Sequence, residues 1–141
     1  MARKKPTLLK RHAALQKVMD RYRHLPFSWA DNRTCIHLLA AHLRAMGYKL
    51  PKMPKLDGPI AAKRELKKRG WASVEAMLDE LLEPIPVAAM LPGDVSILPS
   101  DDGLGGVLIS LGSSCIGYAE GTESMVIFTE PGRVIEKAWR V

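Results

Sequence analysis

Cys35 stands where a polar turn gives way to an amphipathic helix, a place in which a thiol can do chemistry. Residues 29–34 are rich in helix-capping types, and apolar residues then recur at helical spacing as far as Met46. We expect Cys35 in the first helical turn, where free N–H groups and the helix dipole favour a thiolate. A cysteine so placed can have a pKa well below its free value of about 8.5. Cys35 is therefore a candidate nucleophile, and the alternative is a buried packing residue.

A cysteine nucleophile needs a base within hydrogen-bond distance of its thiol. The four histidines are His12, His24, His37 and His42, and none follows them in the chain. On an ideal helix His37 lies about 200° round from Cys35, and His42 lies about 10.5 Å along the axis. Neither can serve Cys35 directly. His24, in the preceding loop, could fold back and is the remaining candidate base.

Several short motifs follow one another in a set order. They are Phe27-Ser28-Trp29, Cys35 at a helix start, Pro92-Gly93-Asp94-Val95 before a strand, the run 106–112, and the closing Ala138-Trp139-Arg140-Val141. In this order they resemble a family of phage tail-gene proteins, which is a divergent branch of the NlpC-type, papain-like cell-wall peptidases. The likeness covers about residues 10–141.

The resemblance implies one papain-like (NlpC-type) α+β domain over residues 1–141, with N-terminal helices packed on a small antiparallel β-sheet. We expect a flexible basic arm at 1–7, a mainly helical half at 8–83 and a β-sheet half at 92–141. The resemblance further implies a virion protein of the tail tip or baseplate, assembled in the bacterial host cytoplasm. Its partners would be other tail proteins of the hub and tip.

The resemblance also bears on catalysis. In active NlpC-type enzymes the second catalytic group is a histidine at the start of a strand, and the matching position here is Gly106 or its neighbour. The implied protein keeps a peptidase-like fold with weak or lost activity. The alternative is an active cysteine peptidase that cleaves peptidoglycan stem peptides during phage entry. Cys35 would then attack the amide, and His24 or a group from a partner chain would take its proton.

Composition excludes several classes of protein. A chain of 141 residues with 47% hydrophobic content suits one folded domain. Two cysteines without a CxxC spacing predict neither a zinc site nor a disulfide framework, so no metal or cofactor is expected. No apolar run reaches the roughly 18 residues of a membrane span, and the start lacks a signal-peptide core.

The net charge of +6 is concentrated in residues 1–23 and in a second basic cluster at 63–69. Such patches attract nucleic acid, anionic cell-wall polymer or an acidic protein face. Eight aromatic residues (two Phe, three Trp, three Tyr) and no recognisable binding motif make nucleic acid an unfavoured partner. A basic assembly chaperone or nucleic-acid-binding factor remains a third hypothesis.

Periodicity predicts helices first and strands second, an α+β order. The expected helices are 8–22, 34–46, 60–68 and 73–82, and the expected strands are 94–98, 107–111, 115–118, 125–129 and 134–139. Short connections favour antiparallel pairing. Asp94 is expected as a turn residue before a strand, Asp101-Asp102-Gly103 as a hairpin tip, and Cys115 as a packed strand residue.

Overall fold

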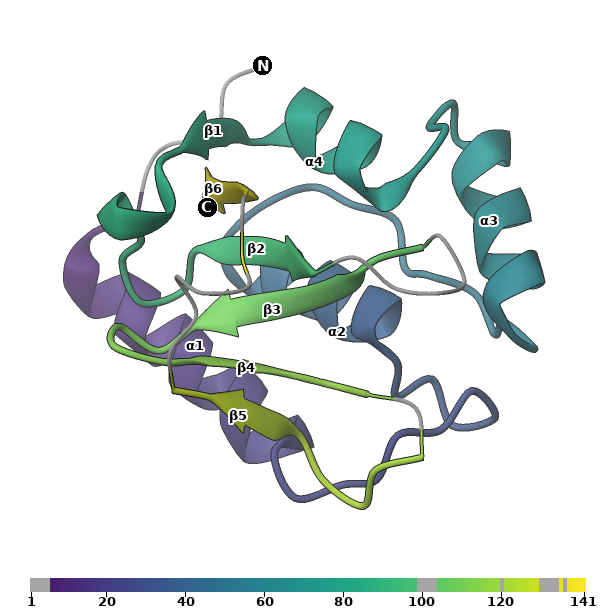
Figure 1. The fold of residues 1–141 in the computed structure, drawn as a ribbon, viewed down its shortest axis with the longest axis horizontal. Coiled ribbons are helices and arrows are strands. Elements are labelled where there is room, and N and C mark those ends of the chain that lie inside the picture. The colour runs from purple at the N-terminus through teal and green to yellow at the C-terminus, as the bar shows by residue number, and fades with distance from the viewer. Residues whose placement is uncertain (1–5, 99–103, 120, 130–134, 136) are drawn as a thin grey trace.

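The computed structural model describes residues 6–98, 104–119, 121–129, 135 and 137–141. Four helices come first and the strands of one sheet follow (Figure 1). The helices are α1 (Leu8–Tyr22), α2 (Cys35–Ala45), α3 (Pro59–Lys68) and α4 (Val74–Leu81). The strands are β1 (Glu83–Ile85), β2 (Val95–Leu98), β3 (Gly106–Ser110), β4 (Cys115–Gly117), β5 (Val126–Phe128) and β6 (Lys137–Arg140), and a short 3-10 helix, η1 (Val87–Ala89), follows β1.

Local capping chemistry explains where the helices begin and end. Thr7, Thr34 and Ser73 each accept a hydrogen bond from the backbone N–H three residues on, at the starts of α1, α2 and α4. Gly47 and Gly70 follow α2 and α3 with φ of 98° and 93°, a conformation that favours glycine. All four predicted helices are confirmed to within one residue at each end.

Of the flexible basic arm expected at residues 1–7, the structure describes only Pro6 and Thr7. Thr7 has extended backbone and its hydroxyl caps α1, so this residue belongs to the helix start. Residues 1–5 of the expected arm lie outside the described residues. The Asp101-Asp102-Gly103 hairpin tip also lies outside them, as does the expected strand start at Val134.

The sheet has the order β1-β6-β2-β3-β4-β5, and every neighbouring pair is antiparallel. β6 comes last in the chain but lies between β1 and β2. Strands β2 to β5 confirm the predicted ones, and β6 is described from Lys137. β1 was not predicted, because Pro84 lacks a backbone N–H for a sheet. At the sheet edge, where β1 lies, a proline is tolerated.

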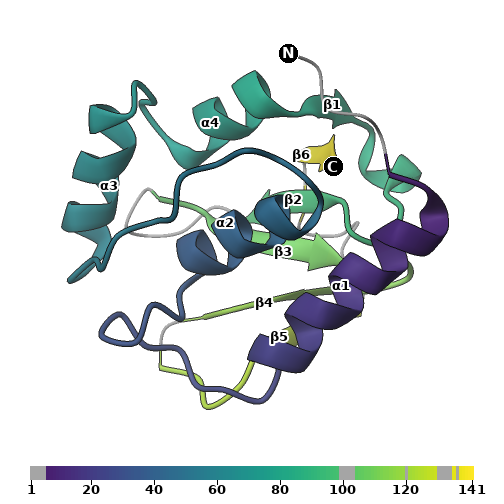
Figure 2. The ribbon, with the colours of Figure 1, turned by 180° about the vertical axis from the view of Figure 1, so that it is seen from behind.

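Helices α1 and α2 lie across one face of the sheet (Figure 2). One hydrophobic core cluster joins side chains of all four helices to the sheet. Along β3, Val107 and Ile109 belong to this core, whereas Leu108 belongs to a second, smaller cluster with Cys115 and Ile135. This alternation is expected of a strand covered on both faces. Cys115 is fully buried, as predicted, and its burial raises the pKa of its thiol.

No helix within the described ranges is long and apolar enough to cross a lipid bilayer.

Candidate functional site

A tight turn positions Cys35. Ser28 and Arg33 exchange two backbone hydrogen bonds of 2.9 and 2.8 Å, and the Ser28 hydroxyl donates to the Asp31 carboxylate at 3.1 Å. Asn32 closes the turn with φ of 59°, a left-handed conformation that asparagine tolerates better than most residues. The turn delivers Cys35 as the first residue of α2, as predicted, and its role as a nucleophile remains a prediction.

The turn is anchored on the sheet half of the molecule. The Phe27 N–H donates to the Thr122 carbonyl at 3.1 Å, and the Tyr118 hydroxyl donates to the Tyr22 carbonyl at 2.8 Å. The Phe27 ring also packs edge-on against Trp29 and Tyr118, with ring centroids 5.7 and 6.2 Å away. Segments about ninety residues apart in sequence therefore hold the cysteine turn in place.

The half-buried Cys35 lies against the start of β3. Its Sγ is 3.9 Å from the carbonyl oxygen of Gly105, the residue before that strand. Gly105 has φ of 85°, and a Cβ there would lie 2.5 Å from Cδ1 of Ile97. The position thus requires glycine, for conformation and for space. Gly105 offers the thiol a carbonyl acceptor, which cannot take a proton as a histidine would.

His37 is committed to a structural role. Its Nε2 lies 2.8 Å from the Pro54 carbonyl, which can only accept, so Nε2 carries the proton. Its Nδ1 then accepts from the hydroxyl of Thr34 at 2.7 Å. Burial lowers the pKa of His37, and the hydrogen bond to Pro54 opposes this shift. With both ring nitrogens engaged, His37 cannot act as a base for Cys35, in agreement with the helical-wheel argument.

Sequence reasoning missed the pairing of Thr34 with His37, although a signal was present. Thr34 is the N-cap and His37 stands three residues on, the spacing of a capping box. Glu or Gln is usual at the second position of that motif and accepts from the N-cap backbone N–H, whereas His37 accepts from the Thr34 hydroxyl. The pairing fixes the first turn of α2, and with it the position of Cys35.

The other histidines lie elsewhere. His42 is fully buried, and its Nε2 donates to the Gly93 carbonyl at 2.7 Å. Burial lowers the pKa of His42 to about 4, so the ring is neutral at physiological pH. His24 is exposed in the turn after α1, and His12 is exposed on α1 itself. The pairing of His24 with Cys35 remains a prediction.

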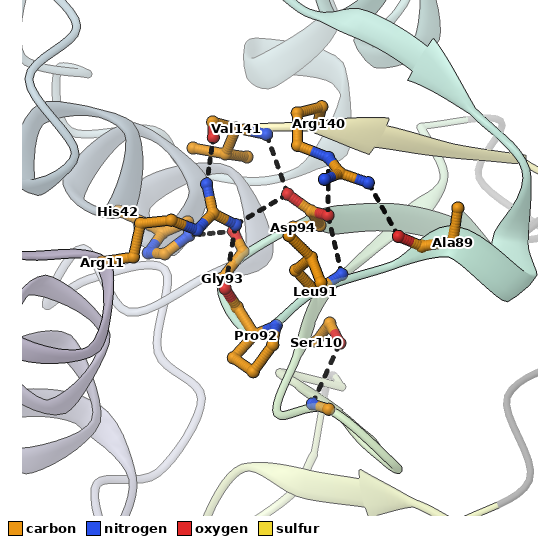
Figure 3. A network of polar contacts seen from close by, with 11 residues as sticks. Arg11, His42, Ala89, Leu91, Pro92, Gly93, Asp94, Ser110, Arg140 and Val141 are labelled. Carbon is orange, nitrogen blue, oxygen red and sulfur yellow. Dashed lines mark hydrogen bonds and ion pairs between the residues drawn. The ribbon is translucent and has the colours of Figure 1, made fainter. Parts of the chain in front are cut away.

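Near the C-terminal end of α2, opposite the end that carries Cys35, lies a buried network of charges centred on Asp94 (Figure 3). The Asp94 carboxylate is fully buried. Its Oδ1 accepts from Arg11 Nη2 at 2.8 Å and from the Val141 N–H at 3.0 Å. Its Oδ2 accepts from the Leu91 N–H at 2.8 Å and forms an ion pair with Arg140 Nε at 3.2 Å. Two cations and two N–H groups therefore compensate one buried charge.

The same network extends to the main chain. Arg11 also donates to the carbonyls of Pro92 and Val141, and Arg140 donates to the carbonyl of Ala89 at 2.7 Å. These contacts join α1, the turn before β2, and β6. Asp94 is a turn residue, as predicted, since its N–H donates to the Leu91 carbonyl at 3.0 Å. Its role as the centre of an ion-pair network was missed.

No group of three or more His, Cys, Asp or Glu side chains that could hold a metal ion occurs in the described parts of the chain.

Over residues 8–141 the chain matches the model of a family described as a domain of unknown function, DUF6950. Neither a curated protein nor a solved structure matches it. Because the family match leaves out only the first seven residues, the chain belongs to the DUF6950 family.

Proposed function

We propose that this protein is a bacteriophage tail protein of the tail tip or baseplate that keeps a papain-like, NlpC-type fold with weak or lost catalysis. The order of the sequence motifs supports the fold assignment. The arrangement of elements also supports it, since a helix that begins with a cysteine packs on an antiparallel sheet.

The observation that carries the proposal is the contact between Cys35 Sγ and the Gly105 carbonyl. In NlpC-type enzymes the residue resembling Gly105 or Gly106 is a histidine at the start of a strand. Here the start of β3 does meet the cysteine, but both positions are glycines and present no side chain to the thiol; at Gly105 a side chain would also be strained by the φ of 85°. The Cys35 thiol therefore contacts a backbone carbonyl at the place where the resemblance would put the catalytic histidine. This favours an architectural role over hydrolysis.

Deleting the gene from the phage and analysing the particles tests this proposal. Tails should be absent or defective, and purified wild-type tails should contain the chain in a few fixed copies. Supplying the Cys35→Ala protein from a plasmid should restore infectious tails as well as the wild type does. Normal assembly after deletion, or tails that lack the chain, would overturn the proposal.

The second candidate is an active cysteine peptidase acting on peptidoglycan stem peptides. The observation in its favour is that Cys35 is half-buried rather than enclosed, at the first position of α2. Sγ would attack the amide carbon, and His24 or a partner's base would pass the thiol proton to the leaving amine as the C–N bond breaks. Backbone N–H groups at the start of α2 would hold the oxyanion, and water would then hydrolyse the thioester.

Digestion of purified muropeptides distinguishes the two candidates. An active peptidase loses cleavage in the Cys35→Ala variant with its fold unchanged, and loses most of it in His24→Ala if His24 rather than a partner's group is the base. Equal digestion by the wild type and Cys35→Ala would exclude this mechanism.

A further inference from the structure

A pocket of about 530 Å³ lies between the end of α3 and the start of α4. Its volume is in the range of small-ligand sites. Three buried side chains, Leu66, Val74 and Leu104, give it an apolar floor. α3 stands at one end of the molecule, and a short connection leads from it to α4, which runs toward β1 (Figure 1). The pocket is thus formed by the helical half together with one residue beside β3.

Beside this apolar floor, the pocket lining includes two lysines and a tryptophan. Lys63 and Lys67 are both exposed and stand four residues apart, on one face of α3. Trp71 is half-buried, and its Nε1 donates to Glu80, which holds the indole in place. Among the described residues that line the pocket, none is acidic. A ligand with an anionic group and an apolar body fits this lining.

The pocket reaches the neighbourhood of the cysteine. Leu104 lines it, and the next residue, Gly105, contributes the carbonyl that meets Cys35 Sγ at 3.9 Å. A ligand bound against Leu104 would therefore lie close to the contact between α2 and β3. Residues 104 and 105 thus connect the pocket with the Cys35 contact.

We propose that this pocket binds the free carboxylate end of a short peptide, with the carboxylate beside Lys63 and Lys67 and an apolar side chain against Trp71 and Leu104. The choice of a peptide rests on the proposed function, because a peptidase-like fold would keep its peptide contacts after catalysis is lost. A strand of nucleic acid requires a series of stacking rings, and among the lining residues that the structure describes Trp71 is the one aromatic side chain.

Tryptophan fluorescence of the full chain, titrated with N-acetyl-trialanine, tests the proposal. The free acid should bind, and the same peptide with a C-terminal amide should bind about tenfold more weakly or not at all. The double variant Lys63→Gln/Lys67→Gln should bind the free acid about tenfold more weakly. The matched control Arg64→Gln/Lys68→Gln removes the same charge from the same helix outside the pocket, and should stay within about twofold of wild type.

Trp71→Phe should remove the fluorescence change that the peptide causes. The affinity of this variant is therefore measured by NMR, from the shifts of the peptide resonances. The proposal is overturned if acid and amide bind equally, if neither binds, or if both double variants weaken binding alike. Tighter binding of a single-stranded oligonucleotide that depends on Lys63 and Lys67 would overturn it in favour of nucleic acid. The binding assay needs no phage particle, so its failure is distinct from a failure of the tail-assembly test.

Discussion

The two ends of α2 are held in different ways. At its first residue, the half-buried Cys35 has a sulfur contact of 3.9 Å with a backbone carbonyl. Near its last turn, His42 is fully buried and donates to Gly93, next to the carboxylate of Asp94. That carboxylate has four partners within 3.2 Å. The thiol at the first residue is half-buried with a long sulfur contact, whereas the carboxylate near the last turn is fully buried among short polar contacts.

The difference separates the residues that carry stability from those available for function. A buried charge network is costly to break because each remaining group loses its compensation. A half-buried thiol whose sulfur lies 3.9 Å from a carbonyl oxygen can change at small cost. We therefore expect the loss in the free energy of unfolding caused by a substitution to decrease from the Asp94 network toward Cys35.

Asp94→Ala should give the largest loss, about 3–5 kcal/mol in the free energy of unfolding, because it leaves the buried Arg11 and the partly buried Arg140 uncompensated. Urea denaturation measures this loss. Asp31→Ala is the control, since its ion pair with Arg33 is largely exposed and should contribute about 0–1 kcal/mol. Equal losses in the two variants would contradict the contrast between buried and exposed pairs.

His42 should make the protein less stable in acid. Its folded pKa of about 4 is below the unfolded value of about 6.5, so between these values the unfolded chain binds a proton that the folded chain does not. The contribution of neutral His42 to the free energy of unfolding is fully present above about pH 6.5. As the pH falls toward 4, about 3 kcal/mol of this free energy is lost. Urea titrations across this range should show a shallower decline in His42→Gln, whereas His12→Gln, an exposed control, should follow the wild type.

Thr34→Ala should cost about 1 kcal/mol, because it removes both the N-cap and the hydroxyl that donates to His37. Thr34→Ser keeps both contacts and should lose less than half as much. Thermal or urea unfolding of the two variants compares them. If serine proves as costly as alanine, the hydroxyl is not what holds the first turn of α2.

The smallest energetic effect is expected at Cys35 itself, where alanine should change the free energy of unfolding by less than about 1 kcal/mol. The thiol should nevertheless be the reactive one. In the folded protein, iodoacetamide should label Cys35 at least about tenfold faster than the fully buried Cys115, as peptide mapping by mass spectrometry would show.

The same labelling sharpens the choice between the two candidate functions. For a scaffold, the rate at Cys35 should rise with pH as for an ordinary thiol. A rate already at its plateau near neutral pH would mean that a base or the helix dipole activates Cys35, and would favour the peptidase.

Local features of this fold were predictable from sequence. Thr34 and Ser73 are good N-caps, and the apolar residues of α2 recur at the helical period, so the helix boundaries depend on neighbouring residues. For the same reason the place of Cys35 at a helix start was predictable. The strands β2 to β5 follow from β-branched and apolar runs between glycines.

Long-range features were not predictable. Arg11 lies 83 residues from Asp94 in sequence, and nothing local distinguishes it from the other 20 Lys and Arg residues. The hydrogen bond from His37 to Pro54 depends on the path of the loop after α2. β1 was not recognised because of Pro84, and its place in the sheet depends on β6, which lies more than fifty residues later.

The position of β6 between β1 and β2 has a consequence for synthesis of the chain. While the ribosome translates the protein, β1 and one edge of β2 have no partner until residues 137–140 emerge. Open strand edges can pair with other chains, so nascent molecules are exposed to aggregation from the emergence of β1 until β6 emerges. Completion of this sheet therefore waits for residues 137–140, and the yield of folded protein in the cell depends on how soon these residues reach β1 and β2.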